Sequence, residues 1–346
     1  MLTHGNLAAN ARDVAEGFGY SSDDCRLNSL PFSHAYARMS DFYVSLYSGS
    51  HLALCRSRET LVADAQNVRP TLLVVVPLQL VRLRQAAETH FGVDDERAVQ
   101  KLLGGRLRGF ICGGAALAAE HHEYFIRQGT PVWEGYGLTE AAPVVALTAA
   151  GVVRRNTVGR AVPGTELRLV EDGELLVKGP QVMAGYWQDP TATREVLCNG
   201  WLHTGDLATI DDDGFVSLQG RKKEFIALAS GKKIWPALLE SQFSSDTLIR
   251  QILIVGEAEN SLGVLVVLHD DAKRTQPLNS SENRQQILQH IGDRLSAFAA
   301  HEQIRHVWLL AEPWTVEQEE LTPKLTLRRQ VILRRYADCV RRMYRE

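Results

Sequence analysis

The chain has 346 residues, of which 45% are hydrophobic and 23% are charged, and its formal net charge is -3. This is the composition of an ordinary globular protein, and so small a net charge does not favour a nucleic-acid-binding protein. The five cysteines show neither metal-ligand spacing nor a disulfide framework, and no apolar run approaches the roughly 20 residues of a membrane span, so we expect a cytoplasmic protein of two or three domains.

The first 143 residues alternate between helices and strands. We predict helices over residues 6–17, 59–66 and 116–127, near residues 35–48 and from Pro77 onward, and strands over residues 26–32, 51–54, 71–76, 107–112 and 131–134. Such alternation is typical of a parallel α/β sheet, in which ligands bind beyond the carboxyl ends of the strands. His34, Gly113-Gly114 and residues 134–140 all follow such strand ends, so we expect a binding site there.

Two other patterns follow along the chain. Between residues 144 and 222, closely spaced turns such as Pro163-Gly164 indicate a small β-rich, barrel-like subdomain. Beyond it, predicted strands and a helix over residues 282–298 indicate an α+β domain. The sequence therefore predicts three parts: residues 1–143, 144–222 and 223–346.

The stretch from Gly200 to Gly231 contains a candidate ligand site. It reads Thr204-Gly205-Asp206, then a predicted hairpin turn at residues 211–214, then Arg221. The hairpin is expected to bring Asp206 close to Arg221, and a carboxylate facing a guanidinium can hold the diol and the phosphate of a nucleotide. A purely structural ion pair is the alternative, and spacing alone does not decide between the two.

A second candidate site is the motif Glu134-Gly135-Tyr136-Gly137-Leu138-Thr139-Glu140. We interpret its two glycines as permitting a sharp turn after a strand. Tyr136 offers a flat face for a purine, Thr139 a hydroxyl for a phosphate, and Glu140 a hard oxygen ligand for Mg²⁺ held together with phosphates. By itself the motif is more often an ordinary turn, but together with the 200–231 stretch it favours a nucleotide site.

Taken together, Tyr136–Glu140, Thr204–Asp206 and Gly220-Arg-Lys-Lys-Glu224 resemble motifs of the adenylate-forming enzymes, most closely those of the long-chain fatty acyl-CoA synthetases. The resemblance implies that ATP and Mg²⁺ convert a fatty acid to acyl-AMP, from which the acyl group passes to CoA. It begins just after the family's phosphate-binding loop, because residues 1–7 match the segment that follows that loop. We therefore expect the C-terminal part of a synthetase: a truncated gene, a misassigned start or one half of a split protein.

The resemblance also implies roles for single residues. Asp206 would accept the ribose hydroxyls, Arg221 would contact ribose or phosphate, and Lys223 would be the hinge between the two half-reactions. The remaining expected roles are pantetheine-channel lining for Gly231, a place near the substrate carboxylate for His34, and the wall between adenine and acyl chain for Gly113, Gly114 and Ala115.

The chain departs from the family near its C-terminus. Where long-chain members read Thr-Pro-Thr-Leu-Lys-Leu-Lys-Arg, with the adenylation lysine fifth, this chain has Thr326 at that position and a lysine two residues earlier, Lys324. The phosphate loop and this lysine each neutralise triphosphate charge, an effect worth roughly 10²–10³ in rate. Two alternatives to a CoA ligase therefore stay open: a non-catalytic AMP-binding remnant and an acyl-AMP ligase that serves a carrier protein.

Two further patterns have ordinary explanations. His121-His122-Glu123 resembles a metal motif, but adjacent helical histidines point about 100° apart, which favours a surface helix. The final helix carries seven arginines between residues 328 and 345, which favours a solvated basic face over a phosphate or peripheral membrane contact.

Overall fold

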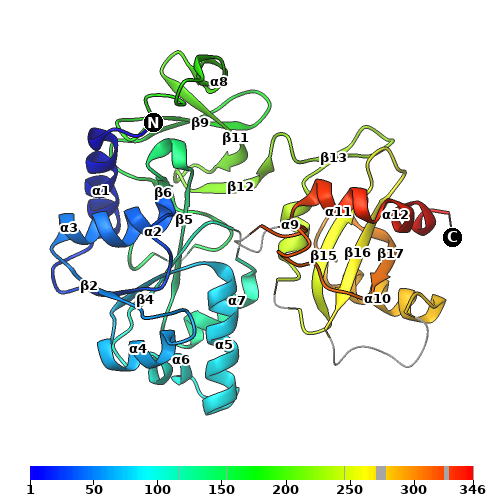
Figure 1. Cartoon of the computed structure of the whole chain (residues 1–346), viewed down its shortest axis with the longest axis horizontal. Helices are drawn as coiled ribbons and strands as arrows, with labels where there is room; N and C mark the ends of the chain where they lie inside the picture. The colour runs from blue at the N-terminus through cyan, green and yellow to red at the C-terminus, as the bar shows by residue number, and fades with distance from the viewer. Residues whose placement is uncertain (116, 153, 245, 270–277, 323–326, 346) are drawn as a thin grey trace. The chain divides into compact units, whose positions relative to one another are not determined.

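The structure is a computed structural model that describes every residue except 116, 153, 245, 270–277, 323–326 and 346. The chain forms two compact units, Met1–Gln219 and Gly220–Glu346 (Figure 1). The first unit contains both the α/β part and the β-rich part expected from the sequence.

The larger sheet of the first unit has seven strands in the order β2-β1-β3-β4-β5-β6-β7. Strands β1 to β5 are parallel, and β6 and β7 continue the sheet in antiparallel pairing. This confirms the predicted parallel α/β sheet. The strands are β1 (Cys25–Asn28), β2 (His51–Leu54), β3 (Leu72–Val75), β4 (Gly109–Cys112), β5 (Val132–Gly137), β6 (Val144–Leu147) and β7 (Arg160–Ala161).

Helices cover both faces of this sheet, which explains why β3 is apolar throughout. Leu73 and Val75 belong to a core with α4 to α7, whereas Leu72 and Val74 belong to a core with α1, η1 and α3. Figure 1 shows the two helix groups on opposite sides of β2 and β4. The helices are α1 (His4–Phe18), α2 (Ala35–Ala37), the π-helix η1 (Arg38–Tyr43), α3 (Val44–Ser48), α4 (Leu61–Val68), α5 (Pro77–Phe91), α6 (Ala98–Leu102), α7 (Ala119–Arg127) and the 3₁₀ turn η2 (Thr139–Ala141).

A second, antiparallel sheet completes the first unit, as the turn-rich sequence predicts. Its order is β10-β11-β9-β8, with β12 paired to β11. The expected hairpin turn is present, because Gly214 has a φ of 82° and its N–H donates to the carbonyl of Asp211 over 2.8 Å. The elements are β8 (Glu166–Leu169), β9 (Glu174–Lys178), α8 (Pro190–Val196), β10 (Leu197–Cys198), β11 (Trp201–Ile210) and β12 (Val216–Arg221).

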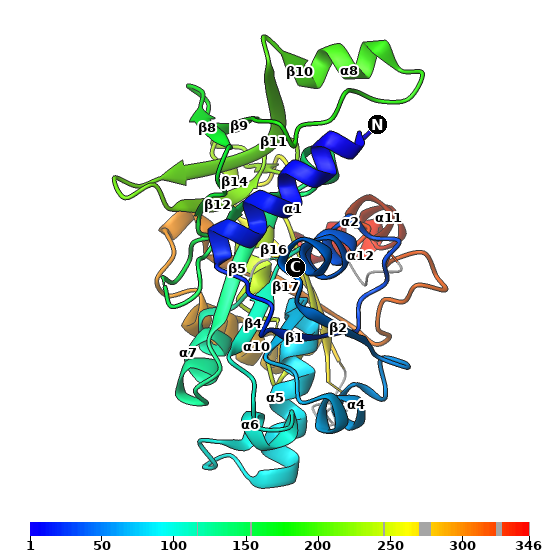
Figure 2. The same cartoon turned by 90° about the vertical axis from the view of Figure 1, so that its left-hand side faces the viewer.

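The first residue of the chain is bound to this second part of the unit. The amino group of Met1 donates to the carbonyl of Gly185 over 2.5 Å, and the N–H of Ala184 donates to the carbonyl of Met1 over 3.0 Å. Figure 2 accordingly shows the N-terminus on the same side as α8 and β10.

The second unit is an α+β domain, as predicted. In its three-stranded sheet β15 pairs antiparallel with β16, which pairs parallel with β17. One face packs on α9 and α10, and the other packs on α11 and α12. The elements are β13 (Ile226–Ala227), β14 (Lys233–Ile234), α9 (Pro236–Ser241), β15 (Ile249–Val255), β16 (Leu262–Leu268), α10 (Ser281–Arg294), η4 (Ala300–Glu302), β17 (Ile304–Leu310), α11 (Arg329–Arg335) and α12 (Ala337–Met343).

The arginine-rich C-terminal segment differs from the single helix expected, because it breaks at Tyr336 into α11 and α12. Several of its arginines lie in ion pairs within the unit: Arg329 with Glu240 at 2.5 Å, Arg335 with Glu320 at 3.3 Å, and Arg341 with Asp338. These pairs support the solvated-face interpretation. Among the helices that the structure describes, none has the length and apolar character to cross a membrane.

Candidate functional site

Strand β5 carries the Glu134–Glu140 motif, and its glycines have a different role from the one expected. The sequence suggested a sharp turn after a strand, but β5 continues through Gly137 and pairs with β6. A Cβ added at Gly137 would lie 1.9 Å from the carbonyl oxygen of Pro143, and one at Gly135 would lie 3.1 Å from the side chain of Leu147. The glycines are therefore required for close backbone packing in the sheet rather than for a turn.

Tyr136 and Asp206, both candidate nucleotide-binding residues, are in direct contact. The phenol of Tyr136 on β5 donates a hydrogen bond of 2.5 Å to Oδ2 of Asp206 on β11, and both side chains are buried, at 8% and 7% exposure. Residues from the two sheets of the unit are thus joined at one point. A buried carboxylate held in this way is a fixed acceptor for a ligand hydroxyl.

The backbone at Asp206 is shaped by its neighbours. The pairing of β11 with β9 shifts register between His203 and Leu207, and Gly205 has a φ of 71° there. The N–H of Gly205 donates to the carboxylate of Glu174 over 3.0 Å. Gly205 therefore provides the left-handed conformation of an irregular strand, and nothing lies within 4 Å of a Cβ added to it. The sequence reasoning missed Glu174, which follows a turn.

Thr139 and Glu140 lie in the η2 turn directly after β5. Thr139 is exposed, and Oε1 of Glu140 accepts a hydrogen bond of 2.8 Å from the hydroxyl of Tyr186. Burial and this bond raise the pKa of Tyr186 to about 12, so the phenol stays a donor at neutral pH. Tyr186 was missed by the sequence reasoning, because its only local signal is an aromatic pair with Trp187 in a polar loop.

Glu140 fits a Mg²⁺ site of one particular kind. Within the described residues no group of three or more His, Cys, Asp or Glu side chains could enclose a metal ion. Mg²⁺ is commonly held by one or two carboxylates together with substrate phosphates, and a single glutamate beside an exposed threonine suits that mode.

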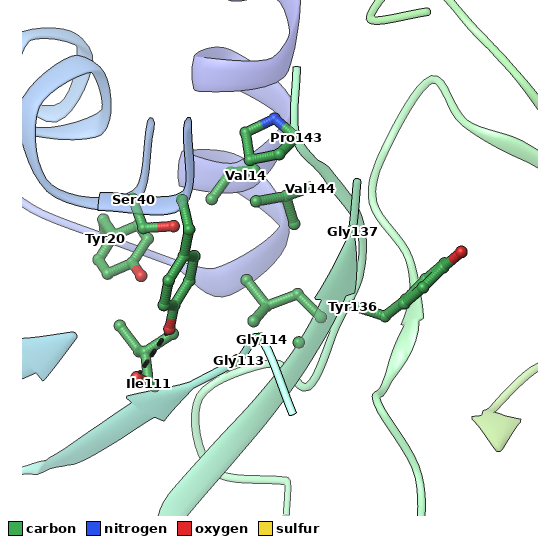
Figure 3. A pocket seen from close by; sticks show the side chains of 13 residues that line it. Val14, Tyr20, Ser40, Ile111, Gly113, Gly114, Tyr136, Gly137, Pro143 and Val144 are labelled. Carbon is green, nitrogen blue, oxygen red and sulfur yellow. Dashed lines mark hydrogen bonds between the residues drawn. The ribbon is translucent and has the colours of Figure 1, made fainter. Parts of the chain in front are cut away.

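Gly113, Gly114 and Ala115 follow β4, and the first two lie beside a cavity of about 70 Å³. Gly114 has a φ of 87°, a conformation that favours glycine. Figure 3 shows Tyr20, Ser40 and Val14 around the cavity, while the ring of Tyr136 projects away from them. Strand β5 therefore separates the side that holds the Tyr136–Asp206 pair from the side that holds the cavity.

His34 lies just before α2 and is half-buried, with its carbonyl accepting the N–H of Arg38 over 3.1 Å. It is not among the residues that line the cavity, whereas its neighbour Tyr36 is. The place of His34 near the substrate carboxylate stays a prediction, since only Tyr36 of the two lines the cavity.

The helix expected at His121-His122 is present as α7, but its two histidines do not lie on the exposed face. Both histidines are buried, and Nε2 of His122 lies 2.7 Å from Oε1 of the buried Glu134. The pattern could not show this, because the glutamate that holds His122 comes from β5, twelve residues away. The carboxylate of Glu134 is thus engaged by a side chain of the protein itself.

The other candidate residues belong to the second unit. Arg221 and Lys223 are exposed, and the carbonyl of Arg221 accepts hydrogen bonds from Glu224 N at 3.0 Å and from the Trp235 indole at 3.0 Å. Gly231, with a φ of 80°, lies in the turn between β13 and β14. The expected approach of Arg221 to Asp206 stays a prediction, because the two residues are in different units. Lys324 and Thr326 lie outside the described residues.

Family comparisons agree with these motifs. The family model of the AMP-binding enzyme matches residues 1–187, and that of the AMP-binding enzyme C-terminal domain matches residues 223–346. The chain belongs to the AMP-binding enzymes. In this adenylate-forming family member, the first match includes Tyr136, Thr139 and Glu140, whereas Asp206 lies between the two matches.

Curated relatives of this AMP-binding enzyme are acyl-CoA ligases. It is 34% identical over 265 residues to the long-chain-fatty-acid–CoA ligase FadD15 of Mycobacterium tuberculosis, covering 72% of this chain and 44% of the relative. It is 31% identical over 291 residues to a feruloyl-CoA synthase of Streptomyces sp., covering 79% of this chain and 57% of the relative. The chain thus spans about half the length of these relatives.

Solved structures show the same fold. O-succinylbenzoate coenzyme A synthetase (MenE) from Bacillus subtilis in complex with AMP matches with a TM-score of 0.77 at 21% identity, covering 95% of this chain and 65% of that one. ATP-bound MatB from Rhodopseudomonas palustris matches with a TM-score of 0.78 at 24% identity, covering 98% and 65%.

Proposed function

We propose that this chain forms the adenylate and acyl-transfer site of an AMP-forming acid–CoA ligase. In the first step a carboxylate oxygen attacks the α-phosphorus of ATP, the bond to the β-phosphate breaks and pyrophosphate leaves. In the second step the thiol of CoA attacks the acyl carbon, AMP leaves and the thiol proton is released. The observation that carries the proposal is the buried Tyr136–Asp206 pair, next to Thr139 and Glu140 at the end of β5.

Each residue has a task that its surroundings support. Asp206 accepts the ribose hydroxyls, while Tyr136 holds that carboxylate and presents its ring to adenine. Thr139 donates to a phosphate, and Glu140, oriented by Tyr186, is the protein ligand for Mg²⁺, which would neutralise phosphate charge when bound. The second unit contributes Arg221 to the nucleotide, Lys223 as the hinge and Gly231 to the pantetheine channel, and Lys324 is the candidate adenylation lysine.

Calorimetry with AMP tests the nucleotide site directly. The 346-residue chain should bind AMP, and Asp206→Ala should weaken the affinity at least tenfold, because a hydrogen-bonded acceptor is lost. The matched control is Asp212→Ala, which removes an exposed carboxylate of the same unit and should leave the affinity unchanged. Equal AMP affinity in Asp206→Ala and wild type would contradict the assignment.

A second polypeptide segment that supplies the phosphate-binding loop is part of this proposal. Two features of the described residues support it. Phe42 and Leu46 on η1 and α3 are 41% and 68% exposed, and β2 pairs only with β1 among the described strands. An apolar surface and an open strand edge are what a further part of the fold would cover.

The alternatives give different results in one assay. Pyrophosphate release and acyl-CoA formation from ATP, a carboxylic acid and CoA are measured for the chain alone and with the polypeptide encoded directly before the Met1 codon. A split ligase gains at least a hundredfold in rate from that polypeptide, since a phosphate-neutralising device is restored. A non-catalytic remnant binds AMP but gains nothing, and a carrier-protein ligase releases pyrophosphate without forming acyl-CoA.

A further inference from the structure

The cavity beside Gly113 is small. Its volume is about 70 Å³, and it is lined by aromatic side chains on the side away from β5, notably Tyr20 and Tyr36. For comparison, an engineered protein cavity of about 150 Å³ holds a single benzene molecule. The space on this side of the sheet therefore suits a group of ring size or less after modest adjustment.

Tyr36 is held firmly where it limits the cavity. Its hydroxyl donates to the carbonyl of Ile111 at 3.0 Å and lies 3.3 Å from the carbonyl of Val75, so it bridges the ends of β4 and β3. Its ring lies against Gly113, where an added Cβ would be 3.2 Å from Cζ of the tyrosine. An acyl chain that displaced this ring would break the hydrogen bonds from the Tyr36 hydroxyl to the backbone carbonyls of β3 and β4.

Tyr20, the second aromatic wall, rests on a buried polar network. The Arg26 guanidinium lies 3.9 Å from the centroid of the Tyr20 ring, a cation–π contact. Arg26 donates to the carbonyl of Ser40 and lies 3.9 Å from the carboxylate of Asp41, which accepts a 2.8 Å hydrogen bond from Asn28. Arg26 and Asp41 are completely buried, so this wall is anchored in the core of the unit.

We propose that Tyr36 sets the size of the acyl group, and that the site takes a compact carboxylic acid, a single ring or a short alkyl chain, and excludes a long one. This inference rests on the proposed function, because it takes the cavity across β5 from Tyr136 as the place of the acyl group. The sequence motifs favour a long-chain fatty acid as the substrate, whereas this inference restricts the substrate to a compact acid. Those motifs include neither Tyr20 nor Tyr36.

Binding of acyl-adenylate mimics to the full chain tests the inference without requiring turnover. Calorimetry compares AMP, benzoyl-sulfamoyl-adenosine and decanoyl-sulfamoyl-adenosine. The wild-type chain should bind the benzoyl probe at least tenfold more tightly than the decanoyl probe. Tyr36→Ala should improve decanoyl affinity at least tenfold and leave AMP affinity unchanged, whereas Tyr36→Phe, which keeps the ring, should retain the wild-type order.

Each outcome decides a separate claim. Wild-type chain that binds AMP and also binds the decanoyl probe as tightly as the benzoyl probe would overturn the inference and leave the proposed function standing. A folded Tyr36→Ala variant with the wild-type order would remove Tyr36 as the limiting residue. Failure of AMP and both probes to bind would reject the proposed function and this inference together. If circular dichroism shows that Tyr36→Ala is unfolded, the relative affinities of wild type and Tyr36→Phe for the two probes still decide the size limit. Tyr36→Leu then replaces Tyr36→Ala as the variant with a smaller side chain.

Discussion

A phenol that donates to a buried carboxylate is the central feature of the site at the scale of single residues. Tyr136 and Asp206 lie 70 residues apart in sequence, and each is almost fully buried. The hydrogen bond helps to keep the carboxylate in one orientation. The same bond should therefore matter for stability as well as for nucleotide binding.

We expect Tyr136→Phe to lower the free energy of unfolding by about 1–3 kcal/mol, because a buried carboxylate loses a hydrogen-bond donor. Urea denaturation measures this loss. Tyr47→Phe is the matched control, since the Tyr47 hydroxyl donates over 2.8 Å to Glu16 at an exposed position, and this change should cost less than about 0.5 kcal/mol. Equal losses in both variants would mean that the Tyr136–Asp206 bond has no special energetic role.

Asp41 lies near Arg26, on which the Tyr20 ring rests, and should make the free energy of unfolding depend on pH. Burial raises its pKa from 3.8 to about 6, although Arg26 and Asn28 oppose the shift. A carboxyl group with a raised folded-state pKa stabilises the fold fully below its unfolded pKa and loses that contribution as the pH rises through 6. The free energy of unfolding of wild type relative to Asp41→Asn should thus fall by about 2 kcal/mol from pH 4 to pH 7.

Urea titrations at pH 4, 5, 6 and 7 measure that difference, in which the other titrating groups cancel. Asp212→Asn, at an exposed carboxylate, serves as control and should follow wild type at every pH. A constant difference between wild type and Asp41→Asn would show that Asp41 titrates normally.

At the scale of elements, β5 organises the site through its pairing with β6. The strand brings Glu134 to His122, Tyr136 to Asp206, and the η2 turn to Tyr186. This arrangement depends on the absence of a side chain at Gly137, where the backbone of Pro143 passes.

We expect Gly137→Ala to destabilise the first unit by about 3 kcal/mol or more, because an added Cβ would overlap the Pro143 carbonyl and force the two strands apart. Thermal unfolding and AMP calorimetry should both show the damage. Gly5→Ala is the control, since Gly5 lies in α1 and an added Cβ would be 3.6 Å from the hydroxyl oxygen of Thr3, so alanine should be neutral or mildly stabilising there. An unchanged melting temperature in Gly137→Ala would contradict the role given to this glycine.

The sequence predicts elements well where the pattern is local and fails where a distant partner decides. Strand β2 was predicted with its observed bounds and α5 with its start at Pro77, because alternation and a proline at the first helical position are local signals. The extension of β5 was missed, since its glycines are explained only by Pro143 and β6. The burial of His122 was missed for the same reason, and Tyr36 gave no signal because its partners are backbone carbonyls.

At the scale of the whole molecule, the chain is two units joined near residue 220. Lys223 is the fourth residue of the second unit, which begins at Gly220, and it is the first residue of the match to the C-terminal family domain. A rotation of one unit about this point would let one set of residues serve adenylation and another serve transfer to CoA. The hinge role of Lys223 remains a prediction.

With the phosphate-binding segment supplied, Lys223→Pro should spare one half-reaction and slow the other at least tenfold, because proline fixes φ near -65° and removes the N–H. Pyrophosphate release and thioester formation are assayed separately. Lys223→Ala, which keeps the backbone freedom and loses only the charge, should retain both rates more fully. Equal slowing of both half-reactions by Lys223→Pro, with the fold intact, would place the hinge elsewhere.

The close-packed glycines also bear on how a saturation-mutagenesis map of this protein should be read. Added Cβ atoms at Gly109 and Gly159 would lie 2.4 Å and 2.0 Å from neighbouring backbone atoms, far inside contact distance, as at Gly137. Every substitution at these three positions should therefore score as damaging, although none of them needs to touch a ligand. Thr139 provides the contrasting case, because its side chain is exposed. If its variants lose activity at normal abundance, the cause is a role of Thr139 in ligand binding or catalysis and not in packing.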